Sequence, residues 1–95
     1  MGGLDMEKEI LKLRIAETIK SFRTASGWSQ EFMGENLRIT ARAYGDLERG
    51  KYCCSSITLL FLLRLLGADN CWSLVESVCT EILRAEQQGR IAANN

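Results

Sequence analysis

Proline and histidine are both absent from this chain of 95 residues. Without proline, a fold of many strands joined by tight turns lacks one of its commonest turn residues. No helix of the chain is interrupted by proline either. Alanine, leucine, glutamate, arginine and isoleucine are abundant, and these residues are typical of helices. Hydrophobic residues make up 46% of the chain, which is enough for one core. The sequence therefore predicts a single all-α domain.

The absence of histidine also removes the commonest acid-base catalyst, and no glycine-rich phosphate loop is present. The carboxylates are scattered among lysines and arginines, as on ordinary solvated helix faces. We therefore expect a protein that is not an enzyme and that carries no cofactor.

Cysteine occurs four times, but in no arrangement typical of a metal site or a disulfide. Cys53 and Cys54 are adjacent, which is poor geometry for a bond between them, and Cys71 and Cys79 are two helical turns apart. There is no C-x-x-C pair, and no histidine can complete a zinc site. Nothing marks secretion, so we expect reduced thiols and no metal.

Long apolar runs are missing as well. The run 57–66 contains Thr58 and Arg64 and is much shorter than the roughly 20 residues that a membrane helix needs. Residues 1–7 have neither the basic nor the apolar stretch of a signal peptide. These features predict a cytoplasmic protein without contact to a membrane.

What the chain does contain is helical periodicity, in five segments. These cover about residues 6–25, 30–37, 40–49, 56–66 and 71–87. Ser29, Thr40 and Ser55 suit the N-caps of the second, third and fourth helices, and Gly50 suits the end of the third. We expect one domain over residues 6–87, with a long C-terminal helix and a frayed tail at 88–95.

Five short motifs follow one another within residues 15–67. They are Arg23, Gly27-Trp28-Ser29-Gln30-Glu31, Leu37-Arg38-Ile39-Thr40, Leu47-Glu48-Arg49-Gly50-Lys51 and Leu65-Leu66-Gly67. In order and spacing this set resembles the phage-repressor/Cro-type (XRE-like) helix-turn-helix family, with no insertion between the motifs. The resemblance implies a repressor-like domain in which two short helices joined by a tight turn bind DNA.

The resemblance also assigns roles to side chains in a DNA interface. The helix at about 40–49 would enter the major groove, with base-facing residues Thr40, Ala41, Arg42 and Asp46. Arginine can donate two hydrogen bonds to guanine, and aspartate can accept one from cytosine. Gln30 and Lys51 would contact phosphates.

Two further features carry structural expectations. By the resemblance, Arg23 and Glu48 correspond to positions that often form a buried ion pair between the first and third helices. Gly34 falls where the second and third helices approach each other, and a large side chain there would force them apart.

The chain departs from the family pattern at several positions. Arg38 occupies the turn position where the family prefers glycine, and a left-handed conformation there would cost about 1 kcal/mol, so we expect a looser turn. Tyr44 replaces an aliphatic residue, Phe32 replaces an exposed polar one, and Cys54 stands in place of a proline.

Charge is balanced, with twelve basic and twelve acidic residues, although residues 20–51 hold six basic and four acidic ones. A monomer with no net positive charge would bind DNA weakly, and two linked copies would bind it more tightly. We therefore expect a homodimer on a palindromic operator. Two apolar stripes are candidate dimer surfaces. They are Ile57, Phe61 and Leu65 in the fourth helix, and the outer side of Val75, Val78 and Ile82 in the fifth. Alternatively, the fifth helix folds back over the fourth within one chain, with Trp72 as its anchor.

The sequence thus favours a sequence-specific transcriptional regulator, in the first place a repressor. Two alternatives stay open. The domain could be a protein-interaction module, such as the toxin-neutralising component of a toxin-antitoxin pair, with secondary DNA binding. It could also be a thiol sensor that uses Cys53 and Cys54, although buried inert cysteines are the simpler interpretation.

Overall fold

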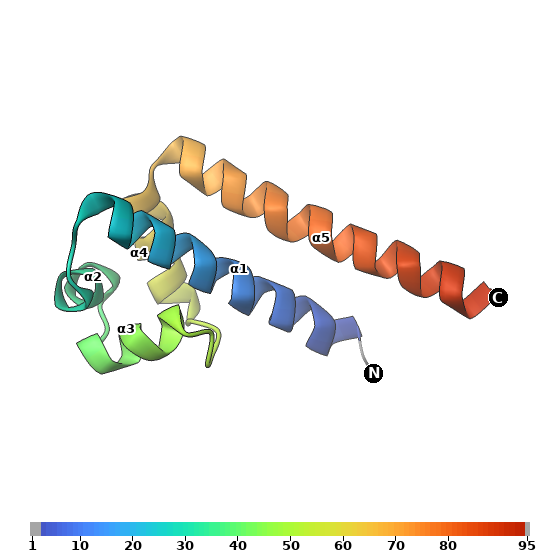
Figure 1. The fold of residues 1–95 in the computed structure, drawn as a ribbon, viewed down its shortest axis with the longest axis horizontal. Helices are drawn as coiled ribbons and strands as arrows, with labels where there is room; N and C mark the ends of the chain where they lie inside the picture. The colour runs from blue at the N-terminus through green and yellow to red at the C-terminus, as the bar shows by residue number, and fades with distance from the viewer. Residues whose placement is uncertain (1–2, 95) are drawn as a thin grey trace.

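The computed structural model describes residues 3–94 of the chain and the side chains of residues 5–89. Within that range the fold is all-α, as predicted. Its helices are α1 (Gly3–Ser26), α2 (Gln30–Leu37), α3 (Ala41–Glu48), α4 (Ser56–Leu66) and α5 (Ala68–Asn94). Figure 1 shows α1 and α5 as two long neighbouring helices, with the three short helices gathered around the C-terminal half of α1. No helix in the described part is long and apolar enough to pass through a lipid bilayer.

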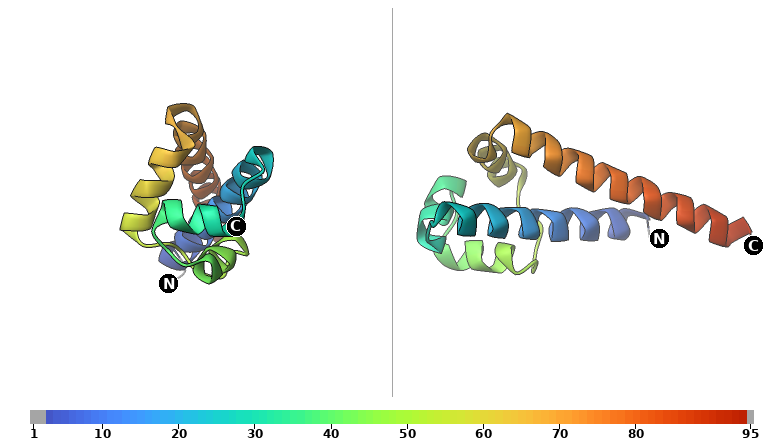
Figure 2. Two further views of the ribbon diagram at one scale, coloured as in Figure 1. Left: turned by 90° about the vertical axis from the view of Figure 1, so that its left-hand side faces the viewer. Right: turned by 45° about the horizontal axis from the view of Figure 1, so that its top comes forward.

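The two long helices run antiparallel, and α5 continues past the start of α1 (Figures 1 and 2). Both are longer than predicted. α1 begins at Gly3 instead of about Met6, and α5 runs through Asn94 instead of ending at Gln87. The tail that we expected to be frayed is therefore helical as far as residue 94. Residues 85–94 contain one glycine and no proline, so no strong helix breaker ends α5 earlier.

The starts of the three short helices are set by the caps that the sequence indicates. In each case the side-chain hydroxyl of Ser29, Thr40 or Ser55 accepts the backbone N–H of the residue three positions on, at 3.0, 3.0 and 3.2 Å. Each cap has extended backbone angles, as an N-cap requires. These local bonds fix the residue at which each of the three short helices begins.

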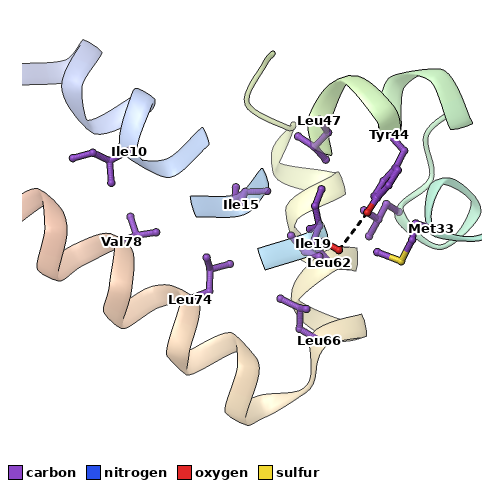
Figure 3. Packing of buried hydrophobic residues seen from close by; sticks show 11 residues of the cluster. Ile10, Ile15, Ile19, Met33, Tyr44, Leu47, Leu62, Leu66, Leu74 and Val78 are labelled. Carbon is purple, nitrogen blue, oxygen red and sulfur yellow. Dashed lines mark hydrogen bonds between the residues drawn. The ribbon is translucent and has the colours of Figure 1, made fainter. Parts of the chain in front are cut away.

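The core lies where α1 meets the short helices (Figure 3). The fully buried large side chains are Tyr44, Ile15, Ile19, Met33, Leu37, Leu47 and Leu62. Leu74 and Val78 of α5 extend this core along α1 toward Ile10. Because α3 supplies both Tyr44 and Leu47 to the core, its inner side cannot turn outward without exposing them.

The turn between α2 and α3 is regular, not looser as we expected. Arg38 adopts the left-handed conformation, with φ 67° and ψ 35°, and is the one non-glycine residue with positive φ in the described range 3–94. The N–H of Ile39 donates to the carbonyl of Gly34 at 2.9 Å, which closes the end of α2. The Arg38 guanidinium lies over the ring of Phe61 in α4, 5.3 Å from its centre, and this contact helps to offset the strain.

Gly34 of α2 lies directly against the backbone that leads into α3. A Cβ atom added there would lie 2.9 Å from the carbonyl oxygen of Ile39 and 3.2 Å from that of Thr40. Both neighbours are backbone atoms, so a larger residue would push the two helices apart. This agrees with the small residue that the sequence required at this position.

Candidate nucleic-acid interface

α3 has one side in the core and one side facing outward. Tyr44, Leu47 and Glu48 are buried on the inner side. Arg42 and Asp46 lie on the opposite side, and Arg49 follows directly after the helix in the same row, about one turn further on. Arg42 and Arg49 are exposed, and Asp46 is half-buried. This outer side is therefore open to a ligand.

The inner end of α3 is fixed by hydrogen bonds to one carboxylate, that of Glu48. Arg23 of α1 donates to both of its oxygens, from Nε at 2.7 Å and from Nη2 at 3.1 Å. Gln30 of α2 donates from Nε2 at 2.9 Å, and the Tyr44 hydroxyl donates at 3.0 Å. The ion pair implied by the resemblance is thus present within a larger cluster. Four donors satisfy a side chain that is only 6% exposed, and they join α1, α2 and α3.

The cluster sets the ionisation of its members. Burial by itself would raise the pKa of Glu48, but the hydrogen bonds from Arg23, Gln30 and Tyr44, together with the charge of Arg23, outweigh it and lower that pKa below its ordinary value of 4.5. Burial and the neighbouring carboxylate raise the pKa of Tyr44, so the phenol keeps its proton. The phenol that replaces the usual aliphatic residue is therefore a permanent donor inside the core.

Of the base-facing residues taken from the resemblance, all except Asp46 lie at the N-terminal end of α3. Thr40 is exposed, but its hydroxyl is engaged as the N-cap. Ala41 is half-buried, and Arg42 is exposed without an ion pair to any described residue. Arg42 is accordingly the side chain of this group that is most available to a base edge.

Asp46 is not a free acceptor. Its Oδ1 atom receives a hydrogen bond from Arg49 Nη2 at 2.6 Å and lies 3.7 Å from Lys51 Nζ. The structure therefore brings Asp46 together with Lys51, which we expected to contact phosphate, and with Arg49, to which we assigned no role. The spacing of three residues between Asp46 and Arg49 is the sequence signal that would have indicated this pair.

The phosphate-contact candidate Gln30 lies beside this group. One N–H of its amide is used by Glu48, which leaves the other for a ligand. A Cβ atom at Gly45 would lie 3.3 Å from Arg49 Nη1 and 3.6 Å from Gln30 Oε1. The bare backbone of Gly45 therefore lets the Arg49 guanidinium fold across α3 toward the start of α2. Arg49, Gln30 and Lys51 form one polar surface.

The apolar stripe that we proposed on α4 is only partly open. Ile57 is 61% exposed, but Phe61 and Leu65 are half-buried against the core, and Arg38 covers the ring of Phe61. α4 is rotated so that Phe61 and Leu65 turn toward its neighbours, while Leu60, which we had not singled out, is 62% exposed. The open apolar residues of α4 are therefore Ile57 and Leu60.

On α5 the open residues also differ from those proposed. Val78 is buried at 8% exposure and faces Ile10 in the core, so its assignment to an outer surface is wrong. Ile82 is half-buried, and Val75 is 41% exposed. Trp72 is 63% exposed, so it does not anchor α5 within the chain, although Cys71 does donate to the Leu63 carbonyl of α4 at 2.8 Å.

The vicinal cysteines lie in the loop after α3 and are half-buried. Burial raises the pKa of the Cys54 thiol, and the neighbouring Cys53 adds to the effect. A raised pKa lowers the thiolate fraction at neutral pH, which is the reverse of what a reactive sensor cysteine needs.

Comparison with known proteins agrees with this architecture. The crystal structure of the clp gene regulator ClgR from Corynebacterium glutamicum is similar to this fold, with a TM-score of 0.61 and 23% sequence identity over 87% of each chain. No curated protein sequence gives a match. A family model for the helix-turn-helix matches residues 19–69, which is more than half of the chain. The protein therefore belongs to the helix-turn-helix family of DNA-binding transcriptional regulators.

Proposed function

We propose that this regulator binds a palindromic operator as a homodimer and represses transcription in the cytoplasm, with the N-terminal half of α3 in the major groove. The proposed recognition of bases rests on the outer side of α3. Arg42 is exposed there without an ion pair to a described residue, while Tyr44 and Leu47 hold the opposite side in the core. A rigid helix that presents a free arginine suits bidentate recognition of guanine.

The phosphate contacts proposed are Gln30 at the start of α2 and Lys51 after α3. Gln30 keeps one amide N–H available, and the N-terminus of α2 adds backbone N–H groups with the favourable sign of the helix dipole. Lys51 is 64% exposed along its side chain. Such contacts hold the protein in register on the duplex without reading its sequence.

Selection of bound sequences from a random DNA pool tests this assignment. We expect a recovered palindrome, followed by a change of preferred sequence for Arg42→Ala at fixed salt. Lys51→Ala should weaken binding to all duplexes alike, because a phosphate contact carries no sequence information. Lys20→Ala, which removes an exposed charge from α1, is the matched control and should leave the preference unchanged. An unchanged preference for Arg42→Ala would contradict the proposed reading surface.

The proposal of a homodimer is supported by an apolar stripe on the outer side of α5. Trp72, Val75 and Leu83 are exposed and are spaced at three and eight residues, with exposed Cys79 between the last two. This spacing places all four on one helical stripe. Exposed apolar stripes of this kind usually mark interfaces.

The spacing of this stripe favours a second copy of α5 in antiparallel orientation. A two-fold axis near Cys79 would place Val75 of one copy opposite Leu83 of the other on both sides of the axis. The two Cys79 thiols would then lie close together. For a palindromic site, the two α3 helices must lie about one DNA turn apart, roughly 34 Å.

Light scattering over a range of micromolar concentrations tests the dimer. We expect the dimer mass for the natural chain and the monomer mass for Trp72→Glu and Leu83→Glu. Ile57→Glu places the same charge on the open side of α4 and should remain dimeric. If Ile57→Glu alone dissociates the dimer, the interface is on α4. A monomer mass at every concentration would contradict the homodimer, and capture of a different protein by α5 would then favour the toxin-neutralising alternative.

A further inference from the structure

The outer side of α3 carries one acidic residue, Asp46. One of its carboxylate oxygens pairs with two cations. Arg49 Nη2 donates to Asp46 Oδ1 at 2.6 Å, and Lys51 Nζ lies 3.7 Å from the same atom. α3 and the residues directly after it carry three basic side chains, namely Arg42, Arg49 and Lys51. Two of these three are therefore held by Asp46 in the free protein.

The held cations lie on the surface that would meet phosphates. Arg49 folds across Gly45 toward Gln30 Oε1, and Gln30 begins α2. Arg49 and Lys51 remain 57% and 64% exposed along their side chains, so both are within reach of a ligand. A phosphate at this position would compete with Asp46 for the same two groups, and the negative charge of Asp46 would repel it.

We propose that Asp46 is a specificity-determining residue that competes with phosphates for Arg49 and Lys51 and so weakens sequence-independent binding. This inference rests on the proposed function. Non-specific complexes depend on phosphate contacts alone, so they lose most when cations are engaged elsewhere. A specific complex also gains the base contacts of Arg42, which is outside these ion pairs. The discrimination between sites is the ratio of the two affinities, and Asp46 widens it.

The test is fluorescence anisotropy of a labelled duplex taken from the random pool and of the selected duplex, each titrated at several salt concentrations. For Asp46→Asn we expect the Kd for the random duplex to fall by about tenfold, and the slope of log affinity against log salt to steepen by about one to two. Each additional phosphate contact contributes about 0.9 to that slope. The Kd for the selected duplex should fall less, so the ratio between the two should narrow.

Two variants serve as controls. Glu35→Gln removes one acidic charge from the exposed side of α2, where Glu35 makes no ion pair with a described residue. It should change the slope of log affinity against log salt by well under one. The double variant Asp46→Asn with Arg49→Gln should lose about half of the gain, because one released cation is removed again.

The outcomes separate this inference from the function on which it rests. If the natural chain binds no duplex, the proposed function is wrong and the inference falls with it. If the natural chain binds DNA and Asp46→Asn behaves like Glu35→Gln, the inference alone is overturned. If Asp46→Asn loses preference at a cytosine position with an unchanged salt slope, Asp46 is a base contact, as the family resemblance implied, and the inference is again overturned.

Discussion

Two acidic residues of α3, only two positions apart, have opposite environments. Glu48 is buried and accepts four hydrogen bonds from three helices, whereas Asp46 lies on the outer side and pairs with two exposed cations from its own segment. The first cluster joins elements that are distant in sequence, and the second joins neighbours. A buried charge contributes to the fold because losing a partner leaves it uncompensated. An exposed charge contributes little to stability but remains free to act on a ligand.

The largest expected effect is at the buried cluster. Arg23→Ala should lower the free energy of unfolding by about 3 kcal/mol, because it leaves the buried Glu48 carboxylate without its positive partner. Lys20→Ala, one turn earlier on α1 and exposed, should change it by less than about 0.5 kcal/mol. Urea denaturation of both variants measures the difference. Equal midpoints would show that the buried pair contributes no more than a surface charge.

The pH dependence of stability is a second test of the buried Glu48 cluster. The pKa of Glu48 is lower in the folded chain than its ordinary value of 4.5. Its contribution is therefore present above about pH 4.5 and is lost as the pH falls through the folded value. Glu48→Gln should be about 1–3 kcal/mol less stable than the natural chain at pH 7, and the gap should narrow toward pH 3. A gap that stays constant between pH 7 and pH 3 would contradict this assignment.

At Arg38 we expect an intermediate effect on stability. Its side chain is exposed, but its backbone has a strained left-handed conformation. Arg38→Ala keeps the strain and loses the contact with Phe61, so it should be destabilised by about 0.5–1 kcal/mol. Arg38→Gly loses the same contact but is relieved of about 1 kcal/mol of strain, so it should stay within about 0.5 kcal/mol of the natural chain. Thermal unfolding of the pair tests this order, and an alanine variant as stable as the glycine variant would contradict it.

The smallest expected effect is at the surface cluster. Asp46→Asn and Arg49→Gln should each change the free energy of unfolding by less than about 0.5 kcal/mol, because an ion pair that is largely open to solvent is worth little. Urea midpoints measured in parallel with the salt titrations check this. A loss of more than about 1 kcal/mol for Asp46→Asn would mean that this cluster is structural, like that of Glu48.

The expectations that held are those that depend on chemistry close in sequence or on a shared family pattern. Ser29, Thr40 and Ser55 cap their helices because a hydroxyl reaches the N–H three residues on, whatever the rest of the fold does. The pairing of Arg23 with Glu48 was available only through the resemblance, since periodicity does not connect residues that are 25 positions apart. The Gln30 and Tyr44 contacts to the same carboxylate were not anticipated at all.

The expectations that failed for α4 and α5 concern which side of a helix faces outward. On α5 the apolar residues at helical spacing include both buried Val78 and exposed Val75, and no feature of the sequence separates them. On α4 the contacts with other helices half-bury Phe61 and leave Leu60 open. The period of a helix defines its stripes, but the rotation of that helix against its neighbours decides which stripe is buried.

By itself, the sequence determined the number and order of the helices, the caps of the three short ones, the close approach at Gly34 and the family to which the chain belongs. These follow from backbone hydrogen bonding, from steric size and from motifs of fixed spacing. Only the tertiary structure decided which donors meet at the buried Glu48 carboxylate, because Arg23 of α1 and Gln30 of α2 lie 25 and 18 positions away along the chain. Packing sets the distances between these groups in space, and a charge interaction depends on distance and burial more than on separation along the chain.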